Sequence, residues 1–171
     1  MQHPLSPMNE LERALTGDSA AAPAAHILEG LADGLVHRRV PGAPHTIYEE
    51  VWHLAFWQQI SLDWARGIET AYPATPSVGF PSDADAKRES WDQLSQRFLD
   101  GCAKAAEITR DEKRLAQPIR CTSQPGKPIR TMSVREQLES LAAHNSYHLG
   151  RIVLLRQLNS AWPPASGGFT W

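Results

Sequence analysis

The fold of this chain is decided by residues 46–68, TIYEEVWHLAFWQQISLDWARGI. Thr46, with Glu49 three positions later, is the pattern of a capping box, which predicts that a helix begins at Thr46. Apolar residues then fall on nearly every face of this helix, so we expect it to be central and mostly buried. The stripe of the helix that carries His53 also holds Trp57, Ile60 and Trp64.

A second long helix is expected near the C-terminal end of the chain. Ser133 and Glu136 repeat the capping-box pattern, and the proline-containing tail ends the helix near Asn159. Apolar residues recur within it at alternating steps of three and four, which is the spacing of one buried helix face. That face comprises Val134, Leu138, Leu141, Asn145, His148, Ile152 and Leu155.

The other segments predict smaller elements and one further long helix. Short helices are expected at 6–16 and 27–35, a loop at 72–81, and a long helix from Ser82 or Asp83 to about Glu107. Two extended segments between 118 and 132 flank Pro125-Gly126. This last pattern indicates a small irregular or hairpin excursion before the last helix.

Helical patterns dominate and no segment shows sustained strand alternation, so we expect an all-α fold. The simplest solution is an up-down four-helix bundle, in which the short N-terminal helices act as the first element. The length of 171 residues fits a single domain over 1–171, with terminal segments at 1–10 and 160–171. Bundles of this kind hold metal ions in their cores, on side chains from facing helices.

Composition and charge argue against several classes of partner. The formal net charge is -2 and Lys and Arg form no long cluster, so no nucleic-acid partner is expected. No apolar run approaches the roughly 20 residues that cross a bilayer, and the N-terminus lacks a signal-peptide pattern. We therefore expect a cytoplasmic protein with no membrane partner. Cys102 and Cys121 lack CxxC spacing and are expected to be buried thiols.

The strongest functional pattern is the pair His144 and His148, four residues apart in the last helix. Residues at that spacing share a helix face, so both imidazoles can point at one cation. If the helix that carries His53 packs alongside, the three histidines form a metal site with one open coordination position, which is typical of catalytic sites. Zn, Ni, Fe and Mn are all candidates. The same pattern also allows the three histidines to satisfy core hydrogen bonds only.

Residues near these histidines refine the possible chemistry. Asn145 stands where an HExxH peptidase has its glutamate, and an amide cannot act as a general base, so a zincin-type peptidase is disfavoured. Glu49 and Glu50 lie within one turn of His53 and are candidates for supporting a ligand histidine or acting as a base. Asn145, beside His144, is also a candidate for supporting a ligand or lining the pocket. Helix capping explains Glu49 equally well.

Two further features suggest a substrate pocket, although no catalytic residue is assigned. Trp57 and Trp64 would line the pocket with aromatic surface. Arg151, one turn beyond His148, is a candidate to meet an anionic substrate, or is solvated as most arginines on helices are. The expected partner is therefore a small-molecule substrate.

At three places the chain resembles the DinB/YfiT-like superfamily of metal-dependent enzymes. These are EVWHLAFWQ at 50–58, HNSYHLGRIV at 144–153 and WPPASGGFTW at 162–171. The resemblance runs from about Leu11 to Trp171. It implies a four-helix bundle, a homodimer, and a divalent metal ion held by His53, His144 and His148.

The resemblance also implies a range of activities. Members of this superfamily include S-transferases that use a low-molecular-weight thiol such as bacillithiol, mycothiol or glutathione as cosubstrate, and others are similar to maleylpyruvate isomerase. We therefore expect a divalent-metal-binding protein that acts on a small molecule as a thiol S-transferase or hydrolase. The alternative is a non-catalytic, stress-associated module that binds a metal or ligand. The sequence identifies neither the metal, the thiol nor the electrophile.

Overall fold

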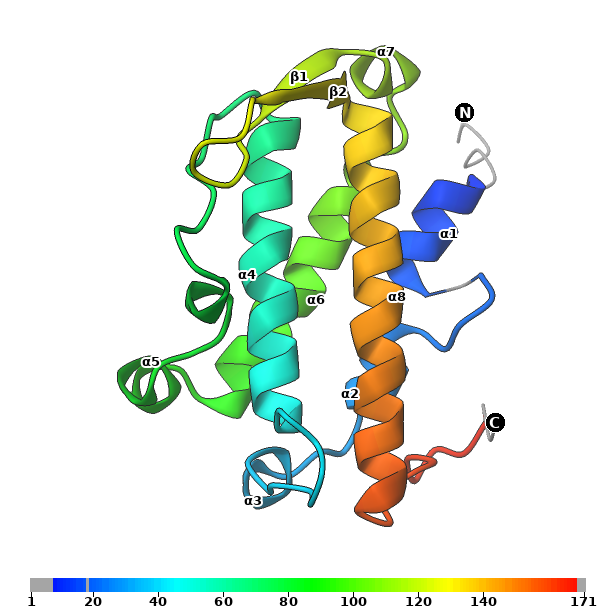
Figure 1. Cartoon of the computed structure of the whole chain (residues 1–171). Helices are drawn as coiled ribbons and strands as arrows, with labels where there is room; N and C mark the ends of the chain where they lie inside the picture. The colour runs from blue at the N-terminus through cyan, green and yellow to red at the C-terminus, as the bar shows by residue number, and fades with distance from the viewer. Residues whose placement is uncertain (1–7, 18, 169–171) are drawn as a thin grey trace.

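Three long helices form the body of the molecule: α4 (Ile47–Ala65), α6 (Trp91–Ile108) and α8 (Val134–Leu158). The computed structural model describes residues 8–17 and 19–168, and Figure 1 shows α4 and α8 side by side with α6 behind them. The smaller elements are α1 (Glu10–Thr16), α2 (Ala24–Leu28), α3 (Asp33–Val36), the 3-10 helix η1 (Pro76–Gly79), α5 (Asp83–Arg88), α7 (Glu112–Leu115), β1 (Pro118–Cys121) and β2 (Arg130–Ser133). The predicted all-α fold is confirmed. None of the described helices has the length and apolar composition needed to cross a bilayer.

The helix directions differ from the strict up-down alternation expected from the sequence. Tyr48 Oη, at the start of α4, donates to the Glu89 carbonyl just before α6, and Gln58 Nε2, farther along α4, donates to the Phe98 carbonyl; both distances are 2.8 Å. α4 and α6 therefore run parallel, and the connection 66–90 returns along the length of the helices. α8 runs antiparallel to α4 (Figure 1), while α1 and α2 pack against α6 and α8.

Side-chain caps set the starts of the two helices that carry the histidines. Thr46 Oγ1 accepts the N–H of Glu49 at 3.2 Å, and Glu49 Oε2 accepts the N–H of Thr46 at 2.7 Å. Ser133 and Glu136 repeat both bonds at the start of α8. Each capping box satisfies backbone donors that the first turn leaves unpaired, so both predicted helix starts are confirmed. Of the predicted helix 6–16, the structure shows α1; residues 6 and 7 lie outside the described part.

Two segments predicted as single helices are each divided in two. The helix expected over 82–107 becomes α5 and α6, because Ser90 starts a new capping box. Its Oγ accepts the N–H of Gln93 at 3.3 Å, and Gln93 Oε1 accepts the N–H of Ser90 at 2.9 Å. The helix expected over 27–35 becomes α2 and α3, separated at Gly30, whose φ of 67° is left-handed and ends a helix.

The predicted hairpin is confirmed and lies over one end of the helices. β1 and β2 pair antiparallel, with Ile119 opposite Met132. The loop between them contains a turn in which the N–H of Lys127 donates to the Gln124 carbonyl at 2.9 Å, and Gly126 takes the positive φ of 79° that this turn requires. Figure 1 shows the hairpin over the end of α4 and the start of α8.

Two hydrophobic clusters hold the helices together, one on each side of a polar layer. The first joins the first half of α4 to α6 and to the last turns of α8; the second joins the end of α4 to the start of α8 and the hairpin. Between them, Gln58 Oε1 accepts from Asn145 Nδ2 at 3.4 Å and from Cys102 Sγ at 3.5 Å. Burial raises the pKa of the Cys102 thiol to about 12, so this cysteine stays protonated. Cys102 and Cys121 are both buried, as predicted.

A substitution at Gly101 tests how closely α6 packs against this polar layer. A Cβ at Gly101 would lie 1.7 Å from Gln58 Nε2, and Gln58 is almost fully buried. We expect Gly101→Ala to lower the free energy of unfolding by about 1–3 kcal/mol, because the core must shift to admit the methyl group. Gly150→Ala on α8, where a Cβ meets nothing within 4 Å, is the matched control. Urea unfolding should show that control unchanged or up to about 1 kcal/mol more stable; equal effects of the two changes would contradict the packing argument.

Candidate metal centre

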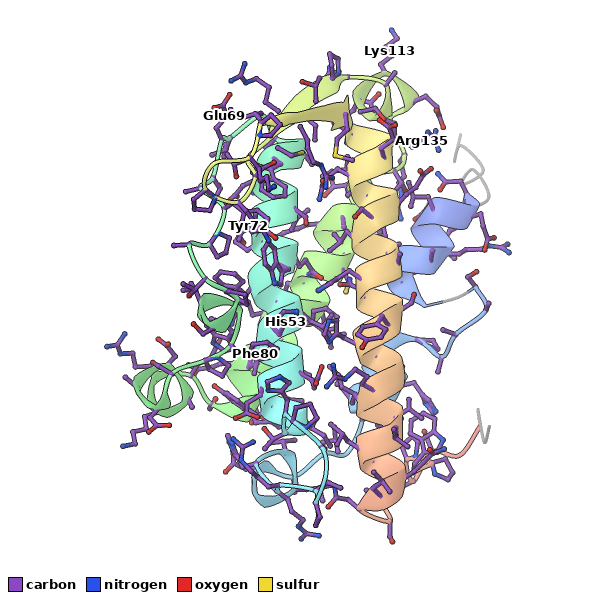
Figure 2. All side chains as sticks on the ribbon, viewed as in Figure 1. His53, Glu69, Tyr72, Phe80, Lys113 and Arg135 are labelled. Atoms are coloured by element: carbon purple, nitrogen blue, oxygen red, sulfur yellow. The ribbon has the colours of Figure 1, made fainter. Side chains whose placement is uncertain are left out.

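The three histidines singled out from the sequence come together between α4 and α8. One nitrogen from each of His53, His144 and His148 lies within 4.8 Å of the others. The closest pair is His53 Nε2 and His144 Nε2, at 3.2 Å. Figure 2 shows His53 at the middle of α4, facing α8. His144 and His148 lie one helical turn apart on the face of α8 that meets α4, so both face the same point as His53.

Two of these rings donate a proton to an oxygen on the side away from the cluster. His53 Nδ1 lies 2.8 Å from the carbonyl oxygen of Gly79, in η1, and His148 Nδ1 lies 2.6 Å from Glu50 Oε2. A carbonyl oxygen and a carboxylate oxygen only accept hydrogen bonds, so each Nδ1 carries the hydrogen. In the neutral form of each ring, Nε2 then presents a lone pair, and a fixed outer hydrogen bond is how proteins orient ligand histidines.

The Glu50 carboxylate is fully buried and links both helices. Its second oxygen, Oε1, lies 2.8 Å from Arg151 NH2, so the carboxylate stands between His148 and a guanidinium. An ionised group with no solvent contact requires such partners, because an unpaired buried charge costs several kcal/mol. Glu50 thus holds His148 in place, and Arg151 balances the charge of Glu50.

Burial keeps two of the imidazoles neutral. Desolvation, opposed by the hydrogen bond to Gly79, lowers the pKa of His53. Desolvation and the neighbouring His148 and His53 lower the pKa of His144 to about 4. A neutral imidazole is the form that binds a metal ion, so both rings are ready ligands at neutral pH.

The donor set fits a divalent cation better than hydrogen bonding alone. A single proton can bridge one pair of ring nitrogens, such as the 3.2 Å pair of His53 and His144, but leaves the third lone pair without a partner. A cation satisfies all three at once. Three neutral nitrogens also match the ligand preference of Zn²⁺, Ni²⁺ and Fe²⁺. The cluster therefore fits a metal ion.

The other residues proposed from the sequence take different places. Glu49 caps α4 and pairs with Arg39 at 2.6 Å. Asn145 points into the polar layer toward Gln58. Arg151 contacts Glu50 and lies over the Tyr147 ring. Trp57 stands beside His53, with ring centroids 6.3 Å apart.

Residues 72–81, which are part of the connection 66–90, contribute to the histidine site in a way that the sequence does not predict. It places the Gly79 carbonyl on His53 and stacks the Phe80 ring on the His53 ring, at a centroid distance of 4.4 Å. A Cβ at Gly79 would lie 3.2 Å from Trp57 Nε1 and 3.3 Å from His53 Nδ1, so a glycine allows this close approach. A proline-rich loop offers no periodic signal that would have revealed these contacts.

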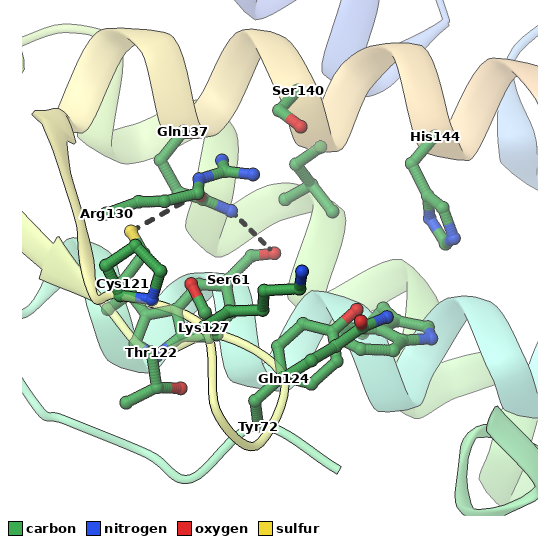
Figure 3. Close-up of a pocket in the computed structure, with 15 residues that line it drawn as sticks. Ser61, Tyr72, Cys121, Thr122, Gln124, Lys127, Arg130, Gln137, Ser140 and His144 are labelled. Carbon is green, nitrogen blue, oxygen red and sulfur yellow. Dashed lines mark hydrogen bonds between the residues drawn. The ribbon is translucent and has the colours of Figure 1, made fainter. Parts of the chain in front are cut away.

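A cavity of about 450 Å³ adjoins His144, between α4, α8 and the hairpin loop. This volume lies within the usual range for small-molecule sites. Figure 3 shows His144 at one end and the loop residues at the other. Its wall is fixed by Gln137, whose Nε2 donates to Ser61 Oγ at 3.0 Å and whose Oε1 accepts from Cys121 Sγ at 3.5 Å. The lining includes Trp57, Trp64, Tyr72, Lys127, Arg130 and Ser140.

Comparison with protein families gives one match. The sequence model of the DinB superfamily matches residues 18–152, a span that contains all three histidines and Glu50. No curated protein matches the chain. The family match covers well over half of the chain and agrees with the resemblance seen in the sequence.

The lowered pKa of His144 predicts how the metal-free protein responds to acid. The unfolded chain takes up a proton near pH 6.5, whereas the folded protein resists until about pH 4, so the unfolded state binds more protons between these values. Stability should therefore fall as pH falls through this window. His144→Gln should make the slope shallower, while His37→Gln controls for removal of an exposed imidazole. Chemical unfolding with a chelator present measures this; an unchanged slope in His144→Gln would contradict the assignment.

Proposed function

The chain belongs to the DinB superfamily, and we propose that it is an enzyme that binds one divalent metal ion through His53, His144 and His148. We further propose that it acts on a small molecule, as a thiol S-transferase or a related hydrolase. The observation that carries this proposal is the convergence of three ring nitrogens beside a cavity of small-molecule size. When bound, such an ion supplies a Lewis acid with a free coordination position.

The protein's own contribution is to fix and shield the ligand set. Glu50 and the Gly79 carbonyl set the rings of His148 and His53 by accepting their Nδ1 hydrogens. Phe80 covers one face of His53 and limits its contact with water. These fixed contacts lower the cost of bringing three ligands to one point, because little rearrangement is needed on binding.

The residues around the cavity favour thiol transfer over hydrolysis. Of the described residues that line it, none is Asp or Glu, and Glu50 is held by His148 and Arg151. A bound divalent ion acidifies water and thiol alike, but free water ionises near pH 15.7 and a free thiol near pH 8.5, so a thiol depends less on a neighbouring base. A low-molecular-weight thiol is therefore the cosubstrate we propose.

Assembly as a homodimer, which the family resemblance implies, stays a prediction. Tyr147, Leu154 and Leu158 are exposed large side chains on one helix, α8. Their spacing of seven and four residues places them on one face. We propose this face as the dimer surface.

Metal binding provides the first test of the proposal. We expect the protein to bind about one equivalent of Zn²⁺, Ni²⁺, Fe²⁺ or Mn²⁺, and to gain about 2.7 kcal/mol in stability at a free metal concentration 100 times the Kd. His148→Ala should lose most of the affinity. His37→Ala, which removes an exposed histidine, should keep it. Metal analysis and thermal unfolding measure both; metal bound equally well by His148→Ala would show that the site lies elsewhere.

Substitutions at Glu50 and at its neighbour Glu49 test whether the Glu50 carboxylate strengthens metal binding by holding His148. Glu50→Gln removes the charge that holds His148 and should weaken metal binding by about 10–100-fold. Glu49→Gln keeps the capping contact, because Gln serves as well as Glu at that position, and should leave affinity unchanged. Competition with a chromophoric chelator gives both constants. Equal losses would mean that the effect comes from helix stability.

Activity is tested with metal-loaded protein, a panel of thiols (glutathione, bacillithiol, mycothiol) and the electrophile monochlorobimane. We expect conjugation that requires both thiol and metal, is lost in His148→Ala and is kept in His37→Ala. Metal-dependent turnover of ester substrates without thiol would favour the hydrolase. Metal binding without either activity would favour a non-catalytic binding module.

A further inference from the structure

The cavity beside His144 has a charged end as well as a metal-binding end. Lys127 and Arg130 line it from the hairpin loop and from the first residue of β2, whereas His144 lines the opposite end (Figure 3). Figure 3 shows the Lys127 and Gln124 side chains extending from the loop toward the side on which His144 lies. These two cations and His144 therefore line one cavity.

Neither cation is neutralised within the described part of the protein. Arg120, on the same hairpin, pairs with Glu69 at 2.6 Å. Among the described residues, the Arg130 guanidinium forms one hydrogen bond, to the Met132 sulfur at 3.4 Å, which is a weak acceptor, and neither Arg130 nor Lys127 forms an ion pair. No described lining residue is a carboxylate. The cavity is thus locally positive in a chain whose net charge is -2.

Three aromatic side chains line the cavity, and hydrogen bonds to one backbone carbonyl join this wall to the hairpin. The Trp57 and Tyr72 rings lie 5.1 Å apart. Trp64 is buried, and its Nε1 donates to the Thr70 carbonyl at 3.1 Å. The same carbonyl accepts from Thr122 Oγ1 at 2.7 Å, which ties the hairpin loop to the aromatic wall. Flat or apolar groups stack favourably on such surfaces.

From these observations we propose that the cavity binds a small organic anion. Its carboxylate or phosphate group pairs with Lys127 and Arg130, its flat or apolar body packs against Trp57, Trp64 and Tyr72, and its other end faces the three histidines. Only the contact at the histidine end rests on the proposed function. The anion contact depends on the hairpin, so the two can be tested apart.

The positive charge at both ends explains why an anion suits this site. A divalent ion on three neutral imidazoles adds two positive charges, and the Glu50 charge is balanced by Arg151. Among the described residues that line the cavity, no anionic side chain offsets these charges. A ligand with an anionic group at the loop end makes charge-assisted hydrogen bonds that a neutral analogue cannot make.

The test compares three aromatic probes that share a metal-binding hydroxamate. These are benzohydroxamate, 4-carboxybenzohydroxamate and 4-phosphonobenzohydroxamate, titrated into metal-loaded full-length protein and followed by calorimetry. We expect at least one anionic probe to bind about tenfold more tightly than the neutral probe, and the better of the two identifies the anion. The advantage should shrink as salt is added, because these cations are exposed.

Variants of the hairpin cations test whether Lys127 and Arg130 bind the anionic group. In the double variant Lys127→Gln/Arg130→Gln, the anionic probes should lose their advantage, while the neutral probe binds as before. Arg120→Gln, which removes a cation of the same hairpin that does not line the cavity, should keep the advantage. Thermal unfolding confirms that the variants fold.

Each outcome separates this inference from the metal proposal. Equal affinity of all three probes, absence of binding by all three, or an advantage that survives the double variant would overturn the inference, whatever the metal does. An advantage that disappears in the double variant, together with affinities of all three probes that are the same with and without metal, would support the anion contact while contradicting the metal role.

Discussion

The buried carboxylate of Glu50 is the contact on which the rest of the site depends. It joins α4 to α8 by accepting from His148 and pairing with Arg151, with no exposure to solvent. A charge in that position would destabilise the protein unless both partners were in place. The carboxylate therefore sets the relative position of the two helices, and with it the distance between His53 and the pair on α8.

The polar layer is tolerated because hydrophobic packing surrounds it. Clusters on both sides, one centred on residues such as Leu54 and Phe98 and the other on Leu62 and Leu138, exclude water and hold α4, α6 and α8 together. Buried polar groups are costly unless every partner is present. Within the layer, Gln58 is bonded to α6 and α8, which connects the histidine cluster to the third helix. The stability of the fold and the geometry of the site are thus supplied by different sets of residues.

The connection 66–90 has a structural and a functional consequence. Because it returns along the helices, α6 runs parallel to α4, and the connection passes directly over His53. It supplies the Gly79 carbonyl and the Phe80 ring to that histidine. The hairpin lines another side of the cavity, and Thr122 Oγ1 bonds it to the Thr70 carbonyl of the connection. Irregular segments that carry functional contacts on a rigid scaffold are common in proteins.

The sequence by itself determined the elements with strong local signals. Capping boxes at Thr46 and Ser133 set the starts of α4 and α8, because their hydrogen bonds form within one turn, and the spacing of His144 and His148 put both rings on one face. Ser90 carries the same capping signal, although the helical pattern on both sides of it predicts one continuous helix. Only the tertiary structure decided that α6 runs parallel to α4, that Arg151 contacts Glu50, that the Gly79 carbonyl meets His53, and that Lys127 and Arg130 line the same cavity as His144. Those contacts join residues far apart in the chain, and no periodic pattern records which distant side chains the packing of helices and loops brings together.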